Sequence, residues 1–387
     1  MAEAVIVATA RTPIGRAFKG SLAEARPDDM AGSIVNTLME KVPEVDRGSV
    51  DDCIIGAANH SGEQGMNVAR NIALLAGLPD TVPGTSVNRF CASSLQAIRM
   101  AYHAIKAGEG DTYVAGGVES VSRTGGRGFQ KEDRNPRFTE GSNDFINNVY
   151  IPMGMTAENV AAQYGVSRER LDEFAKLSQD RATAAQENGF FERELTPYML
   201  PNGDVVSKDD CPRAGTTLEK LASLPPAFKE DGVVTAGNAC PLNDGAAAVL
   251  VMSEDKARSL GLTPLARILG SSVSGLAPEI MGVGPIVALQ KLFAQTGRSI
   301  DDVDVVELNE AFAAQVLPIC DEAGISIEDQ LNPHGGAIAL GHPFGQTGAR
   351  IMTTLINDLQ TLDGTVGVET MCVGGGQGMA MMIERLS

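Results

Sequence analysis

One motif occurs twice in the chain, first as Ser49-Val-Asp-Asp-Cys-Ile-Ile55 and, 250 residues later, as Ser299-Ile-Asp-Asp-Val-Asp-Val-Val306. In each copy an acidic turn precedes an apolar run that is typical of a strand. A second pair of segments has nearly the same spacing: Cys91 and His342 each open a stretch with apolar residues at helical intervals, followed by a strand-like run. Two segment pairs with nearly one offset predict two copies of one unit, rather than a chance similarity of short apolar runs.

Within each copy, short β-rich runs alternate with helical stretches, as at 4–8, 29–41 and 53–56. This alternation predicts an α/β fold with mostly parallel strands. The segment between the copies differs from them in composition. It has a Gly- and Arg-rich stretch, several prolines and an amphipathic helical stretch over 158–188. We expect the following boundaries: an N-terminal half at 1–120 that is closed by 236–258, an inserted loop domain at 121–235, and a C-terminal half at 259–387.

Composition narrows the classes of partner. The chain has 387 residues with 49 acidic and 31 basic side chains, a net charge of −18, which disfavours nucleic acid and anionic membrane surfaces as partners. No apolar run is long enough for a membrane span, and the N-terminus does not resemble a secretory signal. The six cysteines form no CxxC pair and have no metal-ligand spacing, so we expect free thiols, no metal site and a cytoplasmic protein.

Two residues stand where a strand-like run or a Gly-rich loop meets a helix start. At Cys91, the positive end of the helix dipole would favour a thiolate and suit a nucleophile. His342 lies at the corresponding place in the second copy, where it would face Cys91 across a pseudo-twofold axis. A buried structural Cys and a structural His are the alternatives. His60, His103 and His334 lack such a setting, and we expect them to be structural.

Two further residues are candidates. Cys372 precedes a run of glycines whose backbone N–H groups could bind an oxyanion, and the spacing of a phosphate-binding P-loop is absent there. Asn309 follows the expected strand at 303–306, a common place for functional residues in α/β folds, although a simple helix cap is the alternative.

At these residues the chain resembles the thiolase family, nearly from end to end. Four family blocks appear in order: Asn88-Arg-Phe-Cys-Ala-Ser-Ser94, Asn309-Glu-Ala-Phe-Ala313, Gly341-His-Pro343 and Cys372-Val-Gly-Gly-Gly376. The resemblance implies the thiolase fold, with two similar α/β halves in five layers (αβαβα) related by a pseudo-twofold axis, and an inserted loop domain that covers the coenzyme A site.

The resemblance also implies catalytic roles. Cys91 would attack the 3-keto carbon of a 3-ketoacyl-CoA, His342 would accept its proton, and Cys372 would protonate the departing enolate. One oxyanion hole would use His342 and a water held by Asn309. The other would use the backbone N–H groups of Cys91 and Gly374.

For the substrate, the resemblance implies that coenzyme A binds as a substrate and that no separate cofactor is needed. Arg213 would lie on the adenine side, and Cys240, Met153 and Phe312 would contact the acyl-CoA. Three residues depart from the family pattern, and they are Cys240 in place of Ser, His334 in place of Asn, and Pro152 in place of the His of short-chain acetoacetyl-CoA thiolases. The absence of that His favours a degradative enzyme with a broader acyl pocket.

The activity that we expect is therefore that of a 3-ketoacyl-CoA thiolase (acetyl-CoA acyltransferase) in fatty acid β-oxidation. The alternatives are an acetyl-CoA acetyltransferase that makes acetoacetyl-CoA, a condensing ketosynthase, against which Cys372 argues, and a non-catalytic acyl-CoA-binding protein. The expected partners are acyl-CoA and CoA, a second copy or three further copies of the chain, and a β-oxidation hydratase/dehydrogenase subunit.

Overall fold

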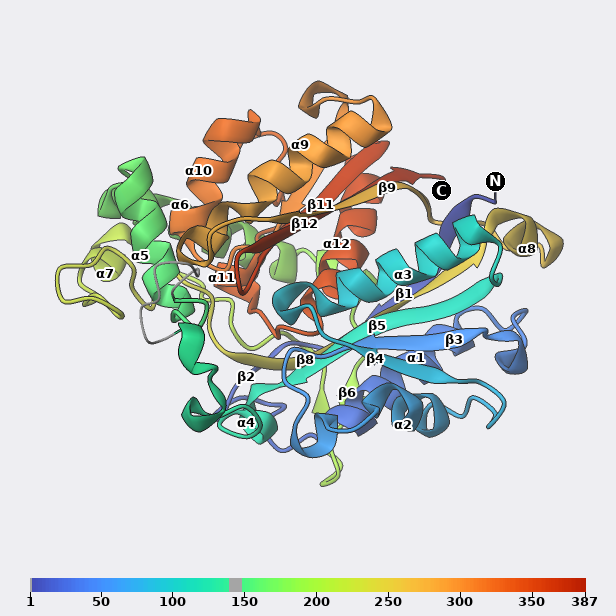
Figure 1. The fold of residues 1–387 in the computed structure, drawn as a ribbon. Helices are drawn as coiled ribbons and strands as arrows, with labels where there is room; N and C mark the ends of the chain where they lie inside the picture. The colour runs from blue at the N-terminus through green and yellow to red at the C-terminus, as the bar shows by residue number, and fades with distance from the viewer. Residues whose placement is uncertain (1, 139–147) are drawn as a thin grey trace.

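Figure 1 shows a computed structural model that describes residues 2–138 and 148–387. Its main sheet has the strand order β10-β11-β12-β9-β1-β8-β5-β3-β4, with β2 paired to β8. The strands are β1 (Ala4–Arg11), β2 (Gly15–Arg16), β3 (Asp52–Gly56), β4 (Gly84–Val87), β5 (Thr112–Ser120), β8 (Asn243–Ser253), β9 (Ala266–Gly275), β10 (Val305–Leu308), β11 (Val366–Val373) and β12 (Gln377–Arg385). A separate hairpin pairs β6 (Tyr198–Met199) with β7 (Val205–Val206).

The order of strands is symmetric about the pair β1–β9, and each half has the same sequence of neighbours. In one half β1 pairs with β8, β8 with β5 and β5 with β3, and in the other half β9 pairs with β12, β12 with β11 and β11 with β10. The parallel pair β3–β4 has its counterpart in an isolated parallel bridge between Val306 and Leu331. Within the sheet, β1 and β9 join the halves through the pairs Val5 with Arg267 and Ile6 with Ala266. This mirrored order is what a duplicated unit predicts.

The helices that pack on the two halves of the sheet complete five layers (Figure 1). They are α1 (Pro27–Glu40), α2 (Val68–Leu75), α3 (Ser93–Ala107), α9 (Gly284–Thr296), α10 (Ala313–Ala323) and α12 (Thr347–Thr361). α3 and α12 pack on each other between the two halves of the sheet, and their apolar faces share one core with strands of both halves. α1 and α2 cover the outer face of the first half, and α9 and α10 cover that of the second. Strands such as β5 and β8 are buried along their whole length, which explains why they are apolar on both faces.

The remaining helices belong mostly to the segment between the halves. They are α4 (Val121–Thr124), α5 (Met153–Tyr164), α6 (Arg168–Glu187), α7 (Leu218–Ala222), α8 (Glu254–Ser259) and α11 (Ala337–Leu340). The division of the chain at 120, 235 and 258 stays a prediction. Within the described residues, no helix combines the length and apolar character that crossing a bilayer needs.

Two expectations about local structure were wrong. Most strand pairs are antiparallel, and the parallel ones are β3–β4, β3–β5 and β10–β11. There are two reasons. β11 and β12 form a hairpin around the glycines after Cys372, and β8 runs antiparallel to β1. The stretch 158–188 does not form one helix either, because Gly165 adopts φ +63° and ends α5, while Ser167 caps the start of α6.

Candidate active site

Cys91 lies on a tight turn between β4 and α3. The turn is a short 3₁₀ helix over Phe90–Ala92, and Phe90 has φ +45°, a strained conformation for a non-glycine residue. The hydroxyl of Ser93 holds the turn, since it accepts the N–H of Arg89 (2.9 Å) and donates to the carbonyl of Phe90 (2.7 Å). The elbow that the sequence predicts is therefore present, and the thiol lies at the start of α3.

The expectation of a low thiol pKa was wrong for Cys91. Burial raises the pKa of this thiol to about 12, and the N–H groups of Gly374 and of Cys91 itself oppose the shift only in part. Desolvation of the thiolate therefore outweighs the helix start. At neutral pH the thiol is protonated, and it needs a base to become a nucleophile.

His342 has the protonation state that such a base requires. Its Nδ1 lies 2.6 Å from the hydroxyl oxygen of Thr347, and that hydroxyl donates its single hydrogen to the carbonyl of Pro343 (2.8 Å). Nδ1 must then carry the proton that Thr347 accepts, which leaves a lone pair on Nε2. Burial, together with the charge of Arg350, lowers the pKa of His342 to about 3. The imidazole is therefore neutral at pH 7, with Nε2 free to accept a proton.

The backbone of His342 is fixed by a polar contact and a glycine. Its N–H donates to Oδ1 of Asn243 (2.9 Å), and the preceding Gly341 has φ +107°. A Cβ at Gly341 would lie 2.6 Å from the Asn243 side chain. α3 and α12 are offset by 254 residues, so the residue that matches Cys91 in the second copy is Gly345, three positions after His342.

Asn309 is a partner of His342 and not a helix cap. It follows β10, its Nδ2 lies 3.3 Å from His342 Nε2, and its N–H donates to the carbonyl of Thr370 in β11 (3.0 Å). α10 begins only at Ala313, with Phe312 at the cap position. Asn309 Oδ1 is buried and has no hydrogen-bond partner among the described residues. That oxygen is available to hold a water, as the sequence comparison with the family implied.

Cys372 lies near the end of β11 as a protonated thiol. Its Sγ lies 3.3 Å from Oε1 of Gln315, to which the thiol donates. Burial raises the pKa of Cys372 well above its ordinary value, and negative charge on Cys91 or Cys240 would raise it further. The three thiols are thus near enough to interact electrostatically. Gly282 makes room for Gln315, because a Cβ there would lie 2.3 Å from the Gln315 side chain.

A cavity of about 690 Å³ opens at Cys91. Gly374 and Met153 also line it, as does Phe344, whose ring contacts that of His342 edge to face at 5.1 Å between centroids. Cys91 and Gly374 thus share the wall of this cavity, and His342 contacts the ring of Phe344 without lining the cavity itself. His60 lies in its wall too, although nothing in the sequence around His60 indicated this.

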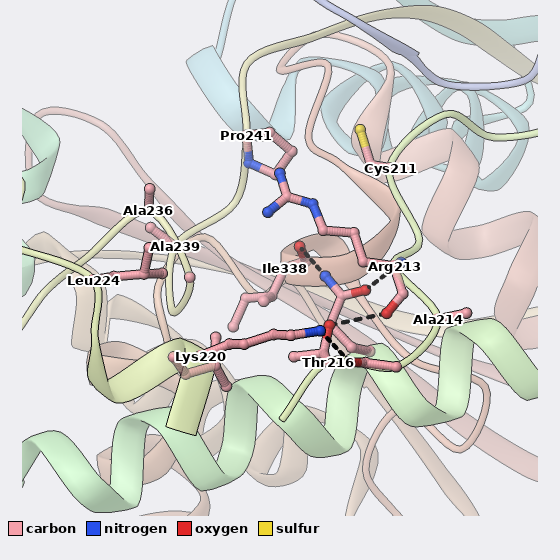
Figure 2. A pocket seen from close by; sticks show the side chains of 14 residues that line it. Cys211, Arg213, Ala214, Thr216, Lys220, Leu224, Ala236, Ala239, Pro241 and Ile338 are labelled. Carbon is pink, nitrogen blue, oxygen red and sulfur yellow. Dashed lines mark hydrogen bonds between the residues drawn. The ribbon is translucent and has the colours of Figure 1, made fainter. Parts of the chain in front are cut away.

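A second cavity of about 220 Å³ lies beside α6 and α7, and Figure 2 shows Arg213 and Lys220 among its walls. The N–H of Arg213 donates to Oε1 of Gln179 (2.8 Å), which fixes the backbone at this arginine. Ala239 and Pro241 line the same cavity. Cys240 stands between these two residues, and its pKa is raised first by burial and then by the Cys91 charge.

The chain around Cys240 therefore runs from this second cavity toward Cys91. Cys240 lines neither of the two cavities, and nor does Phe312, which is buried, bridges to Ala239 and packs its ring against Phe228. Among the described residues, no group of three or more His, Cys, Asp or Glu side chains could hold a metal ion.

Several residues with clear roles escaped the sequence reasoning. Thr347 and Gln315 orient the imidazole and the second thiol, but a lone Thr or Gln in a helix carries no signal of its own. His334 has the structural setting that we expected. Its ring stacks on Phe190 with centroids 3.5 Å apart, and its Nδ1 contacts Asp358 at 2.5 Å.

Comparisons with known proteins agree with this architecture. The family model of the thiolase N-terminal domain matches residues 4–255, and that of the thiolase C-terminal domain matches residues 262–385. A "Beta-ketoadipyl-CoA thiolase" of Acinetobacter baylyi is 46% identical over 100% of both chains, and a "3-ketoacyl-CoA thiolase" of Saccharophagus degradans is 44% identical over 99% of this chain and 98% of its own. The crystal structure of the Bacillus anthracis acetyl-CoA acetyltransferase superposes with a TM-score of 0.90 at 42% identity and covers 100% of this chain and 99% of that one. The chain belongs to the thiolase family of acyltransferases.

Proposed function

We propose that this chain cleaves a 3-ketoacyl-CoA with free CoA, giving acetyl-CoA and a shortened acyl-CoA through an acyl-cysteine intermediate. The observation that carries the proposal is the tautomer of His342. A neutral imidazole held by Thr347, with a lone pair on Nε2 and its ring against Phe344 of the cavity wall, supplies the base that the Cys91 thiol needs.

In the first half of the proposed reaction, Nε2 of His342 takes the proton of Cys91, and Sγ attacks the 3-keto carbon. The N–H groups of Cys91 and Gly374 would stabilise the oxyanion that forms, and both face Sγ closely enough to oppose the rise of its pKa. The bond between C2 and C3 then breaks, its electron pair forms the acetyl-CoA enolate, and the Cys372 thiol protonates C2.

The enolate oxygen also needs donors while this happens. The imidazolium of His342 and a water on Asn309 would provide them. In the second half, a CoA thiol gives its proton to the Cys372 thiolate and attacks the thioester. The Cys91 thiolate leaves and recovers its proton from His342, so that every group returns to its starting state.

The acyl group is a separate question. A fatty 3-ketoacyl-CoA, as in β-oxidation, is the first candidate, supported by the missing His at position 152. A 3-ketoacyl-CoA that ends in a carboxylate is the second candidate, favoured by the name of the Acinetobacter baylyi relative. The name of the Bacillus anthracis protein supports the third, acetoacetyl-CoA synthesis. The oligomer, the hydratase/dehydrogenase partner and the cytoplasmic location stay predictions.

The test is a thiolysis assay with purified protein and free CoA. Its substrates are acetoacetyl-CoA, 3-oxohexanoyl-CoA, 3-oxododecanoyl-CoA and 3-oxoadipyl-CoA, and Cys91→Ala is the control. CoA-dependent cleavage that the control lacks supports the proposal, and the profile across the four substrates separates the acyl classes. Binding of acyl-CoA without cleavage of any of them would instead support a non-catalytic acyl-CoA-binding protein.

A further inference from the structure

The cavity at Cys91 has an unusual wall for a pocket that receives a hydrocarbon chain. Most of its lining is apolar or aromatic, as at Phe129, Ile151 and Met153. One guanidinium, that of Arg134, belongs to the same lining. In a chain with a net charge of −18, a cation that lines an apolar cavity has to be explained by what the cavity binds.

An aromatic platform supports Arg134. Its guanidinium carbon lies 5.5 Å from the ring centroid of Tyr150, a cation–π contact. Tyr150 stacks on Phe129 at 5.6 Å and meets Phe138 edge to face at 5.9 Å, while its hydroxyl accepts the N–H of Asn135 at 3.1 Å. A cation–π contact uses none of the five N–H donors of a guanidinium for a hydrogen bond, so they can still bind an acceptor.

No carboxylate of the described residues forms an ion pair with Arg134. Other exposed or half-exposed arginines do find partners: Arg123 pairs with Glu63 at 2.6 Å and Arg170 with Asp321 at 2.8 Å. The neighbouring Asp133 forms no ion pair with Arg134, and its carboxylate accepts the N–H of Gln130 at 2.7 Å. Arg134 is therefore a cation on an aromatic support in the wall of the acyl cavity, and within 2–138 and 148–387 no carboxylate pairs with it.

We propose that Arg134 binds a carboxylate at the far end of the acyl chain, so that the cavity favours a 3-ketoacyl-CoA that ends in a carboxylate over one that ends in a methyl group. This inference rests on the proposed thiolase function. A guanidinium can hold a carboxylate through two parallel N–H···O bonds, and a methyl end leaves those donors without an acceptor. Arg134 is exposed at the rim of the cavity, so solvent screens this interaction and salt weakens it.

The test compares 3-oxoadipyl-CoA with 3-oxohexanoyl-CoA, which have six-carbon acyl chains and differ in the terminal group. The readout is the ratio of the two kcat/KM values in the wild type, Arg134→Gln, Arg134→Lys and the control Arg127→Gln. Arg127 belongs to the same loop but does not line the cavity. We expect Arg134→Gln to lower the ratio by about 3- to 5-fold, mainly through KM for the charged substrate, the upper part of the range for an exposed ion pair. Arg134→Lys should keep part of the ratio, and Arg127→Gln should keep all of it.

A second measurement needs no variant. Raising the salt to about 1 M, where the Debye length is about 3 Å, should lower the wild-type ratio. If the wild type cleaves both substrates but Arg134→Gln keeps the ratio within twofold, or lowers it no more than Arg127→Gln does, the inference about Arg134 is wrong while the proposed function stands. If the wild type cleaves neither substrate nor acetoacetyl-CoA, the proposed function fails and the inference fails with it.

Discussion

Replacing Thr347 by Val isolates the hydrogen bond that sets the tautomer of His342. Val has nearly the shape of Thr but has no oxygen to accept the proton of Nδ1. In the wild type, Nδ1 lies 2.6 Å from the hydroxyl oxygen of Thr347. A buried donor that loses its acceptor costs about 1–3 kcal/mol. The tautomer with the proton on Nε2 then becomes competitive, and it cannot act as the base. At about 1.4 kcal/mol per tenfold in rate, we expect kcat/KM for thiolysis to fall by about 5- to 150-fold.

The control lies six residues further along the same helix. Thr353 is also buried, and its hydroxyl also donates to the carbonyl four residues before it (Ala349, 2.8 Å), but it has no imidazole partner. Thr353→Val should therefore lose the same kind of hydroxyl-to-carbonyl bond, lower the free energy of unfolding no more than Thr347→Val does, and keep near wild-type kcat/KM. Alkylation of Cys91 by iodoacetamide should slow in Thr347→Val alone, since it also needs the base. Equal kcat/KM values in the two variants would refute the assignment of the tautomer to Thr347.

Three further predictions concern the other groups of the site. In Cys372→Ala, carbon–carbon cleavage and deuterium exchange at the acetyl-CoA methyl should slow by about 10²–10⁴-fold. The variant should still exchange label between acyl-CoA and free CoA. Methyl exchange at the wild-type rate would show that Cys372 is not the acid. Arg213→Ala should raise the KM for CoA much more than it lowers kcat, because it removes binding common to ground and transition states, and an unchanged KM would take Arg213 out of the CoA site. His342→Gln should gain stability relative to the wild type as the pH falls from about 6.5 toward about 3, because unfolded His342 binds a proton in that range and the folded form does not. Urea unfolding at pH 7 and pH 5 measures this, and the same difference in free energy of unfolding between variant and wild type at both pH values would contradict it.

The duplicated fold could be predicted because its signal is periodic and repeated. The acidic turn before an apolar run marks β3 and β10, and the helical intervals after Cys91 and His342 mark α3 and α12. Strand direction could not be predicted in this way, because β-rich text has the same appearance in parallel and antiparallel strands. The pairing of β8 with β1, of segments more than 200 residues apart, and the hairpin of β11 with β12 decide it.

The site divides along similar lines. Cys91, His342 and Cys372 each lie in a distinctive sequence motif, and the fold brings them to one region. The residues that orient them, Thr347 and Gln315, are ordinary helix residues whose role depends on distances across the fold. The thiol pKa was predicted in the wrong direction because a sequence displays the helix start beside Cys91 but not the burial that outweighs it.

Burial and proximity together also order the steps of the proposed reaction. Both thiols have raised pKa values, and a negative charge on Cys91 raises that of Cys372 further, so the two cannot easily ionise at the same time. While Cys91 is a thiolate, Cys372 therefore keeps its proton. Once the C2–C3 bond breaks, Cys91 is a neutral thioester and the negative charge lies on the enolate, which takes the Cys372 proton at C2 and leaves the charge on the Cys372 sulfur. The same electrostatic coupling returns the proton of the incoming CoA to Cys372 before Cys91 leaves as a thiolate, so a single buried negative charge passes between the two sulfurs through the cycle.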